Sequence, residues 1–283
     1  MNKNIITKVK ESIEKMPPLS PVVHKIIEVA NDVTASAREL TEVIQMDPVL
    51  MSKLIKMVNS AYFGLPEQIT SIKQAVVMLG INTLKNVAIS STVVGQMDIK
   101  TNTIMDGDEF WKHSFGVGVA SKMIAKEIGI DSKVLEEYFV SGLIHDIGKV
   151  LINNFFSDEL HTILEIRSKT NRSLLEVEKH VLGVNHQEVG IAIGKKWNFN
   201  QNYLYAVGKH HDPSLSGQSG IYSVVISLAN KIVKHAGYED ENYYITEEID
   251  ESIWEEINVN PEIIYNKLGS LSAEVEKAKE FLQ

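Results

Sequence analysis

The chain has 283 residues, no cysteine, and 37 acidic against 28 basic side chains, which gives a formal net charge of -9 at pH 7. Without cysteine it forms neither a disulfide scaffold nor a thiolate metal site, and the acidic charge argues against a nucleic-acid partner. No apolar run reaches the roughly 20 residues that cross a bilayer, and the N-terminal segment lacks the apolar region of a secretory signal. We therefore expect a cytoplasmic protein with no membrane contact.

The first hundred residues carry the start and stop signals of several helices. Ser20, Ser36 and Asp47 each precede an apolar pattern with a period of 3.6 residues, and each is expected to cap the first turn. Gly80 predicts the end of a later helix, and Asn82 is expected to cap the helix that follows it.

Residues 59–69 contain the breaker residues Gly64 and Pro66 and are expected to form a structured loop. Two roles for this loop remain open on the sequence alone. It is either a surface for a partner, or a segment that caps and packs the neighbouring helices, and the second alternative is favoured.

The rest of the chain also reads as helix. Polar residues accumulate at 98–108, the expected boundary between two lobes, and the short β-branched runs at 191–193 and 224–226 lie inside helical patterns with no hairpin turn beside them. We predict an all-α, two-lobed helical bundle. Its parts are an N-terminal lobe at 1–100, a second lobe at 105–235, and an acidic helical C-terminal extension at 236–283.

The second lobe contains histidines and an aspartate in an order that indicates a metal site. The candidate ligands are His113, His145, Asp146, His186, His210 and His211. Glu109 lies four residues before His113, on the same helical face, and is a further candidate. The helices of a bundle can direct such side chains into one cavity. Imidazole together with carboxylate favours a divalent transition metal (Fe, Mn, Zn or Ni) and excludes a soft-metal site.

Two interpretations of the His145-Asp146 pair compete. Both residues lie in an apolar segment, where an unpaired buried charge costs several kcal/mol, so both side chains need partners. In the first interpretation they form hydrogen bonds to neighbouring helices and bind nothing. In the second they coordinate a metal.

Four segments carry a resemblance to known families. GLIHDIGK, at residues 142–149, resembles the core motif of the HD superfamily of metal-dependent phosphohydrolases. The segments at 16–32, 39–64 and 69–90 are similar to the N-terminal region of the HDOD family, the HD-related output domain of bacterial signalling proteins. The resemblance spans about residues 14–235. It implies an all-helical regulatory module of a kind that is often joined to receiver or other signalling domains, and many of whose members have lost the metal ligands.

The resemblance also implies roles for individual residues. The ligand positions of catalytic HD proteins correspond here to His113, His145, Asp146 and His186. His210 and His211 match the paired histidines of the branch that hydrolyses cyclic dinucleotides, and Glu109 matches an additional ligand of some members of that branch. Lys149 matches the family's candidate phosphate contact.

Asn230 is the main departure from the catalytic pattern. Catalytic HD enzymes usually have an aspartate there, whereas asparagine offers a neutral carbonyl oxygen as a ligand and removes a negative charge. The Gly-Tyr-Pro loop of the cyclic-di-GMP phosphodiesterases is also absent after His211.

We therefore expect a signal-transduction output module that acts through contacts with a signalling protein and has a modified, catalytically weak or inactive HD metal site with no other cofactor. The alternative is a metal-dependent phosphohydrolase that acts on a nucleotide or cyclic dinucleotide.

Overall fold

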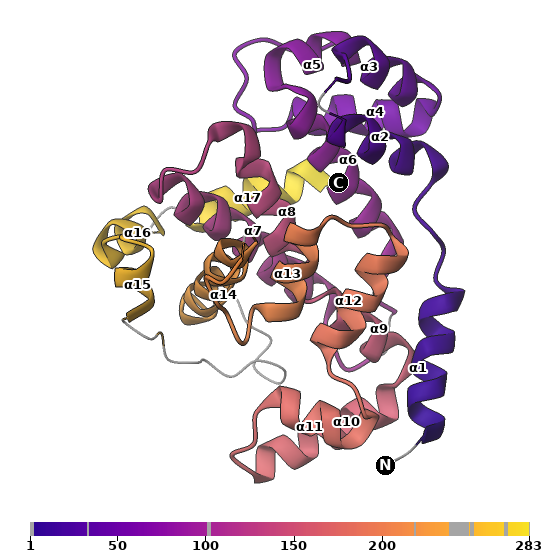
Figure 1. The fold of residues 1–283 in the computed structure, drawn as a ribbon, viewed down its shortest axis with the longest axis vertical. Coiled ribbons are helices and arrows are strands. Elements are labelled where there is room, and N and C mark those ends of the chain that lie inside the picture. The colour runs from indigo at the N-terminus through magenta and orange to yellow at the C-terminus, as the bar shows by residue number, and fades with distance from the viewer. Residues whose placement is uncertain are drawn as a thin grey trace.

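The computed structural model describes residues 3–32, 34–100, 103–217, 219–237, 249, 252–268 and 271–282, and these residues contain helices and connecting segments but no strand (Figure 1). The all-α fold predicted from the sequence is therefore confirmed. The elements are α1 (Lys3–Lys15), α2 (Pro21–Asn31), α3 (Ala37–Gln45), α4 (Pro48–Val58), α5 (Ile72–Leu79), α6 (Ile81–Gln96), α7 (Gly107–Glu127), η1 (Ser132–Val134), α8 (Leu135–Ile144), α9 (Ile147–Phe155), α10 (Ser157–Lys169), α11 (Leu174–Leu182), α12 (His186–Lys196), α13 (Gln201–Lys209), α14 (Gly220–His235), α15 (Ser252–Glu256), α16 (Pro261–Leu268) and α17 (Leu271–Leu282).

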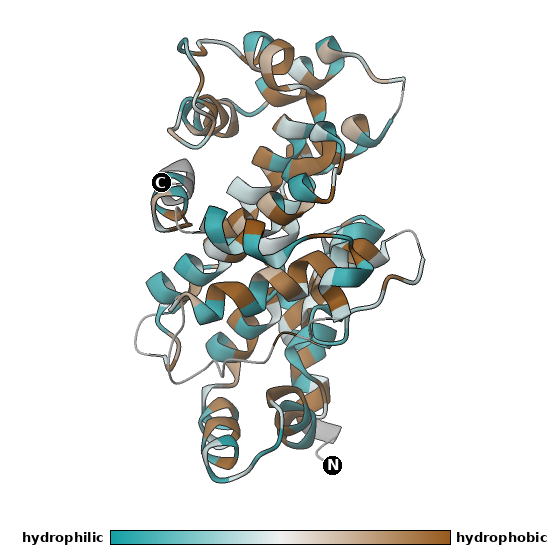
Figure 2. Cartoon of the chain, turned by 90° about the vertical axis from the view of Figure 1, so that its left-hand side faces the viewer, coloured by the Kyte–Doolittle hydropathy of each residue, from teal (hydrophilic) through white to brown (hydrophobic). Residues whose placement is uncertain are grey.

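The helices form an elongated molecule (Figure 1). Helices α2 to α5 gather at one end, α10 and α11 lie at the other, and α7, α8, α13 and α14 form the middle. Most helices carry hydrophobic residues on one side and hydrophilic residues on the other, as the brown and teal stripes of Figure 2 show. The apolar sides meet in one continuous core that runs from Ile5 to Val275.

The predicted caps of the N-terminal helices are present. The Ser20 hydroxyl accepts a hydrogen bond from the Val23 backbone N–H at 3.2 Å, and Ser36 and Glu39 form the reciprocal capping box at the start of α3. Asp47 caps α4 through its Oδ1 atom. These caps satisfy backbone donors that a helix leaves without an intrahelical partner, and they fix where each helix begins.

Gly80 ends α5 as predicted, in a backbone conformation with φ of 84° that favours glycine. The expected cap at Asn82 is wrong, because α6 begins at Ile81 directly after Gly80 and Asn82 lies within its first turn. A single glycine therefore separates the two helices.

Residues 59–69 pack against the helices around them. The Asn59 side-chain amide donates to the carbonyl oxygens of Ile55 and Ile69, both at 2.8 Å, and its oxygen accepts from the Ile69 backbone N–H at 2.7 Å. One side chain thus holds both ends of the loop, which supports the favoured packing role.

Glycines set the closest helix contacts of the second lobe. A Cβ added at Gly142 of α8 would lie 2.7 Å from the Cα of Gly118 on α7, and one added at Gly148 of α9 would lie 1.9 Å from the backbone oxygen of His186 on α12. Only glycine permits backbones to approach so closely. The Gly148 contact brings His145 and Asp146, which precede α9, close to the start of α12.

Glu137, near the start of α8, joins three other helices through buried contacts. Its carboxylate forms an ion pair with Lys85 of α6 at 3.0 Å and accepts hydrogen bonds from Tyr222 of α14 at 2.9 Å and Asn202 of α13 at 3.3 Å. Lys85 and Glu137 are 3% and 7% exposed. This polar contact ties the N-terminal helices to the second lobe.

The adjacent Glu136 makes a second set of contacts at the same boundary. It pairs with Lys122 of α7 and accepts a hydrogen bond from the Tyr62 hydroxyl at 3.1 Å. The Lys122 ammonium also lies 4.5 Å from the centre of the Tyr62 ring. The first turn of α8 therefore contacts the N-terminal part of the chain and the helices α7, α13 and α14 through two neighbouring carboxylates.

The two ends of the chain pack on the second lobe. Helix α1 lies against α9 and α12, where the Trp197 indole N–H donates to the Pro17 carbonyl oxygen at 3.1 Å. Helix α17 packs on α7 and also touches α4 and α6. Part of the predicted acidic extension, including residues 238–248, lies outside the described residues, and the proposed lobe boundaries remain a prediction.

No single helix of the described segments is both long and apolar enough to span a membrane. Helices α5 and α6 pass that test only as a pair, and they are bent by 117° with respect to each other.

The contact at Gly148 predicts that Gly148→Ala destabilises the protein by about 3 kcal/mol or more, because the added methyl group overlaps the His186 backbone. Urea unfolding measures this change. Gly95→Ala is the matched control, because a Cβ at Gly95 in α6 meets no atom within 4 Å, and alanine there should stabilise the helix by roughly 0.5–1 kcal/mol. Equal stability of the Gly148→Ala variant and the wild type would contradict the close approach of α9 and α12.

The buried Lys85–Glu137 pair predicts that Lys85→Met costs about 3–5 kcal/mol of unfolding free energy, because Glu137 then stays buried without its cation. The double variant Lys85→Met/Glu137→Leu should be more stable than the single variant. A double-mutant cycle measured by urea unfolding checks both statements. Lys25→Met, which removes the exposed pair with Glu28, is the control and should leave stability unchanged. Additive effects within the cycle would show that the buried pair is not coupled.

Candidate metal centre

The predicted ligands come together at the ends of helices. His145 follows the last residue of α8, Asp146 precedes α9, His186 is the first residue of α12, and His210 follows α13. His113 lies inside α7. Two groups of side chains have ligand atoms that all lie within 4.8 Å of one another. They are Asp146, His186, His210 and His211, and His113, His145 and Asp146. Asp146 belongs to both groups.

Asp146 is the centre of the cluster. Its Oδ2 atom lies 3.1 Å from Nε2 of His145, and its Oδ1 atom lies 3.4 Å from Nε2 of both His186 and His210. These four residues are at most 1% exposed. Imidazoles from three different parts of the chain therefore face one buried carboxylate.

Several atoms that face the cluster lack a hydrogen-bond partner among the described residues. They are Nε2 of His145, His186 and His210, and Oδ1 of Asp146. Buried polar atoms are normally satisfied, because each unsatisfied one costs about 1–3 kcal/mol. A cation at this point would supply a shared partner for nitrogen lone pairs and carboxylate oxygens, so the residues present fit a metal ion.

The other ring nitrogen of each histidine explains why Nε2 carries the lone pair. Nδ1 of His145 lies 2.7 Å from the Gly142 carbonyl oxygen, and Nδ1 of His210 lies 2.9 Å from that of Val207. A carbonyl oxygen can only accept, so each Nδ1 must hold the proton. In the neutral ring Nε2 is then unprotonated, as metal ligation requires.

Burial favours the neutral form of His113, His186 and His210. It lowers the pKa of His186 to about 3, and it lowers the pKa values of His113 and His210 well below their usual range. Burial acts in the opposite direction on Asp146, but the neighbouring His145 and Lys149 outweigh it and hold the pKa of that carboxyl well below its usual range. Neutral His113, His186 and His210 beside an ionised Asp146 have the protonation states that a divalent cation needs.

Lys149, predicted as a phosphate contact, lies within the cluster. Its ammonium group is 2.6 Å from Oδ2 of Asp146, and the residue is 1% exposed. The lysine therefore neutralises part of the charge of Asp146. Its role toward phosphate remains a prediction.

The two additional candidate ligands differ in their surroundings. Glu109 lies one turn before His113, but its side chain is 40% exposed, pairs with Lys112 at 3.4 Å, and belongs to neither group. Asn230, on α14, is 2% exposed. Asn230 thus has a buried neutral oxygen, whereas Glu109 is partly exposed and belongs to neither group of ligand atoms.

Glu178 of α11 is a residue that the sequence interpretation missed. It is fully buried, and its Oε2 atom lies 2.8 Å from Nδ1 of His186. Burial raises the pKa of Glu178 to about 8; a bound divalent cation would oppose this effect, because it favours ionised carboxylates. One signal was available: Glu178 stands midway between Leu174 and Leu182 on the apolar side of its helix.

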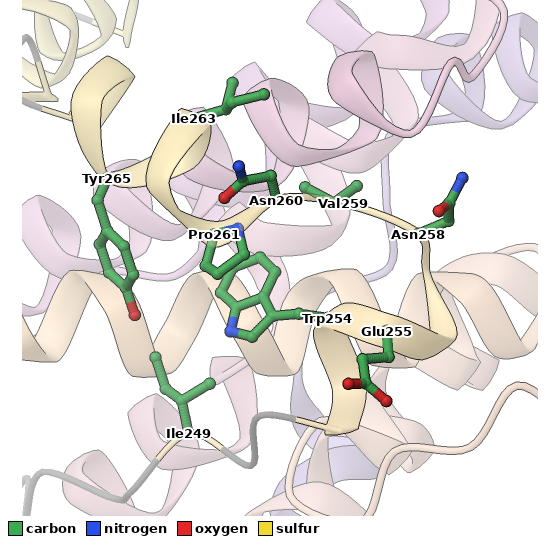
Figure 3. A pocket seen from close by; sticks show the side chains of 9 residues that line it. All are labelled: Ile249, Trp254, Glu255, Asn258, Val259, Asn260, Pro261, Ile263 and Tyr265. Carbon is green, nitrogen blue, oxygen red and sulfur yellow. The ribbon is translucent and has the colours of Figure 1, made fainter.

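A large hollow lies elsewhere. It has a volume of about 790 Å³ and is lined by residues of the C-terminal part, among them Trp254, Pro261 and Tyr265 (Figure 3). None of the cluster residues lines it. We place the candidate chemistry at the histidine cluster, because donor atoms of metal-ligand type converge there.

Comparison with known proteins agrees with this geometry. The HDOD domain matches residues 16–213, more than two thirds of the chain. The fold is similar to that of an HDOD domain protein of unknown function from Geobacter sulfurreducens (TM-score 0.79, 21% identity, 98% of this chain and 96% of that one). It is also similar to that of a proposed phosphohydrolase from Shewanella amazonensis SB2B (TM-score 0.75, 22% identity, 97% and 98%).

A curated protein is also similar to part of the chain. The chain is 25% identical over 194 residues to ribonuclease Y 1 of Pediococcus pentosaceus, an alignment that covers 68% of this chain and 30% of that protein. The chain spans about a third of the length of the first curated relatives that it matches. The match of the family over residues 16–213 is decisive, and the chain belongs to the HDOD domain family.

Proposed function

We propose that this protein is a signal-transduction output module that acts through contacts with a protein partner, and that its buried cluster holds a divalent transition metal without efficient hydrolysis. The observation that carries the proposal is the enclosed position of the donors: Asp146, His186 and His210 converge at 0–1% exposure. Closed sites are typical of structural metals, whereas catalytic metals keep an open position for water or substrate.

The donor set supports Fe, Mn, Zn or Ni, because imidazole nitrogen and carboxylate oxygen suit these ions. A bound metal of this kind polarises phosphoryl oxygens and lowers the pKa of bound water. The chain's own contribution is to hold neutral imidazoles with their Nε2 atoms toward Asp146 and to exclude solvent from them.

Asn230 argues against efficient chemistry. The resemblance aligns it with a carboxylate of the catalytic enzymes, and an amide oxygen there gives one negative charge fewer. Asparagine can neither act as an anionic ligand nor take up a proton, so it would support a divalent cation and its water less well than aspartate would.

Contacts with a protein partner are supported by apolar side chains on the N-terminal helices. Met46, Val49 and Val77 are 71%, 68% and 75% exposed, and the helices α3, α4 and α5 around them pack together. Single exposed apolar residues are normal, but several on one group of helices favour association. The proposal also includes a cytoplasmic location.

The alternative is a metal-dependent phosphohydrolase that acts on a nucleotide or cyclic dinucleotide. The observation that favours it is the number of imidazoles: five histidines have ligand atoms within 4.8 Å of those of Asp146 in the two groups. The names of two similar proteins, a proposed phosphohydrolase and a ribonuclease, point the same way. The net charge of -9 argues against RNA as the substrate.

Metal binding predicts that Mn²⁺ or Zn²⁺ added to metal-stripped protein raises its melting temperature, because an ion that binds only the folded state stabilises it by about 2.7 kcal/mol at roughly 100 times its Kd. His186→Ala should remove the effect, whereas His180→Ala, an exposed position on α11, should retain it. Elemental analysis of the purified protein complements the melting curves. If the melting curve does not change on addition of metal, and the His145→Ala and Asp146→Ala variants melt like the wild type, the cluster binds no metal and has only a structural role.

The proposed loss of chemistry predicts little turnover by the metal-loaded wild type with bis(p-nitrophenyl) phosphate, nucleotides or cyclic dinucleotides. Asn230→Asp restores the carboxylate and should raise the rate by roughly 10²-fold if this position alone limits the reaction. Asn230→Asp/Asp146→Ala is the control for contaminating activity. Strong turnover by the wild type that disappears in His145→Ala and Asp146→Ala would overturn the regulatory proposal in favour of the enzyme.

A further inference from the structure

Glu178 stands where an acidic side chain is costly. It lies on the apolar side of α11, between Leu174 and Leu182, and none of its surface is exposed. Its Oε2 atom accepts two hydrogen bonds, both from His186: one from the backbone N–H at 2.9 Å and one from Nδ1 at 2.8 Å. A buried carboxylate with hydrogen bonds to a single residue lowers the stability of the protein relative to an apolar side chain at the same position.

The position of His186 within its helix explains why it needs this partner. His145 and His210 follow the C-terminal ends of α8 and α13, where the carbonyl oxygens of the last turn can accept further hydrogen bonds, and each ring donates to one of these oxygens of its own helix. His186 is the first residue of α12, where the groups without a partner are N–H donors. Its own helix therefore offers no acceptor for Nδ1–H.

The consequence concerns the other ring nitrogen. Nε2 of His186 faces Oδ1 of Asp146 at 3.4 Å. Without an acceptor at Nδ1, the ring proton can move to Nε2 and be donated to Asp146, and Nε2 is then no longer a ligand atom. A carboxylate behind Nδ1 holds the proton there and also raises the basicity of Nε2.

We infer that Glu178 is a positioning residue that fixes the ring orientation and the Nδ1–H tautomer of His186, and thereby makes His186 competent to bind a metal. This inference deepens the proposed function and rests on it for the identity of the ligand as a divalent cation. Glu178 itself does not belong to either group of ligand atoms.

The first experiment examines the histidine ring of the metal-free protein. Nitrogen-15 NMR at a pH above about 8, where Glu178 is ionised, with the His186 signals assigned through a His186→Gln variant, should show the Nδ1–H tautomer in the full-length wild type. Glu178→Met, which fills a similar volume without an acceptor, should lose or mix that tautomer. Glu178→Gln, whose amide oxygen can still accept, should keep it. An unchanged tautomer in Glu178→Met would overturn the inference, whether or not the protein binds metal.

The second experiment measures the affinity for Mn²⁺ or Zn²⁺ by calorimetric titration. Glu178→Met should bind the ion roughly 10- to 100-fold more weakly than the wild type, and Glu178→Gln should lie between them because it keeps the contact but loses the charge. Glu176→Ala is the matched control: it removes the capping box of the same helix and does not touch His186.

The outcomes separate the two proposals. If Glu176→Ala weakens binding as much as Glu178→Met does, Glu178 acts only through the stability of α11 and the inference is wrong. If the wild type binds neither ion although the tautomer responds to Glu178→Met, the positioning role stands and the metal proposal fails. If Glu178→Met does not fold, Glu178→Gln carries the test, and an affinity equal to that of the wild type would count against the inference.

Discussion

The carboxylate of Asp146 is the group around which the buried histidine cluster is arranged. Its two oxygen atoms lie within 3.4 Å of imidazole nitrogens from His145, His186 and His210, and the site is closed to solvent. A buried anion of this kind is stable only when neighbouring groups compensate its charge. The helix contact at Gly148 is required for the arrangement, because it lets the start of α12 reach the Asp146 side of α9.

Helix α8 connects this cluster with residues of the N-terminal helices. Its first turn carries Glu136 and Glu137, which contact Tyr62 and Lys85 of the N-terminal part, and its last residue is followed by His145. The helix has ten residues and is buried along its whole length. A displacement of α8 would therefore change both the polar contacts between the lobes and the ligand geometry, since a packed helix moves as a unit.

Much of this could be predicted from the sequence, because the signals are local. Ser20, Ser36 and Asp47 cap helices within three residues of themselves, and the helical period distinguishes the β-branched runs from strands. Residue type and order also selected the candidate ligands, and the structure brings six of them into two groups of neighbouring ligand atoms. Glu109 is the exception: its spacing from His113 was correct, but spacing alone does not determine burial.

The partners of the ligands could not be predicted, because they depend on which helices meet. Glu178 and His186 are eight residues apart on separate helices, so the spacing within one helix does not relate them. The acceptor at Nδ1 determines whether the Nε2 atom of a histidine is available as a ligand. A ring at the C-terminal end of a helix finds a carbonyl acceptor in that helix, whereas a ring at an N-terminal end must obtain one from elsewhere. A motif therefore identifies ligands, but the position of each ligand within its helix determines whether it also needs a partner from another helix, as His186 does.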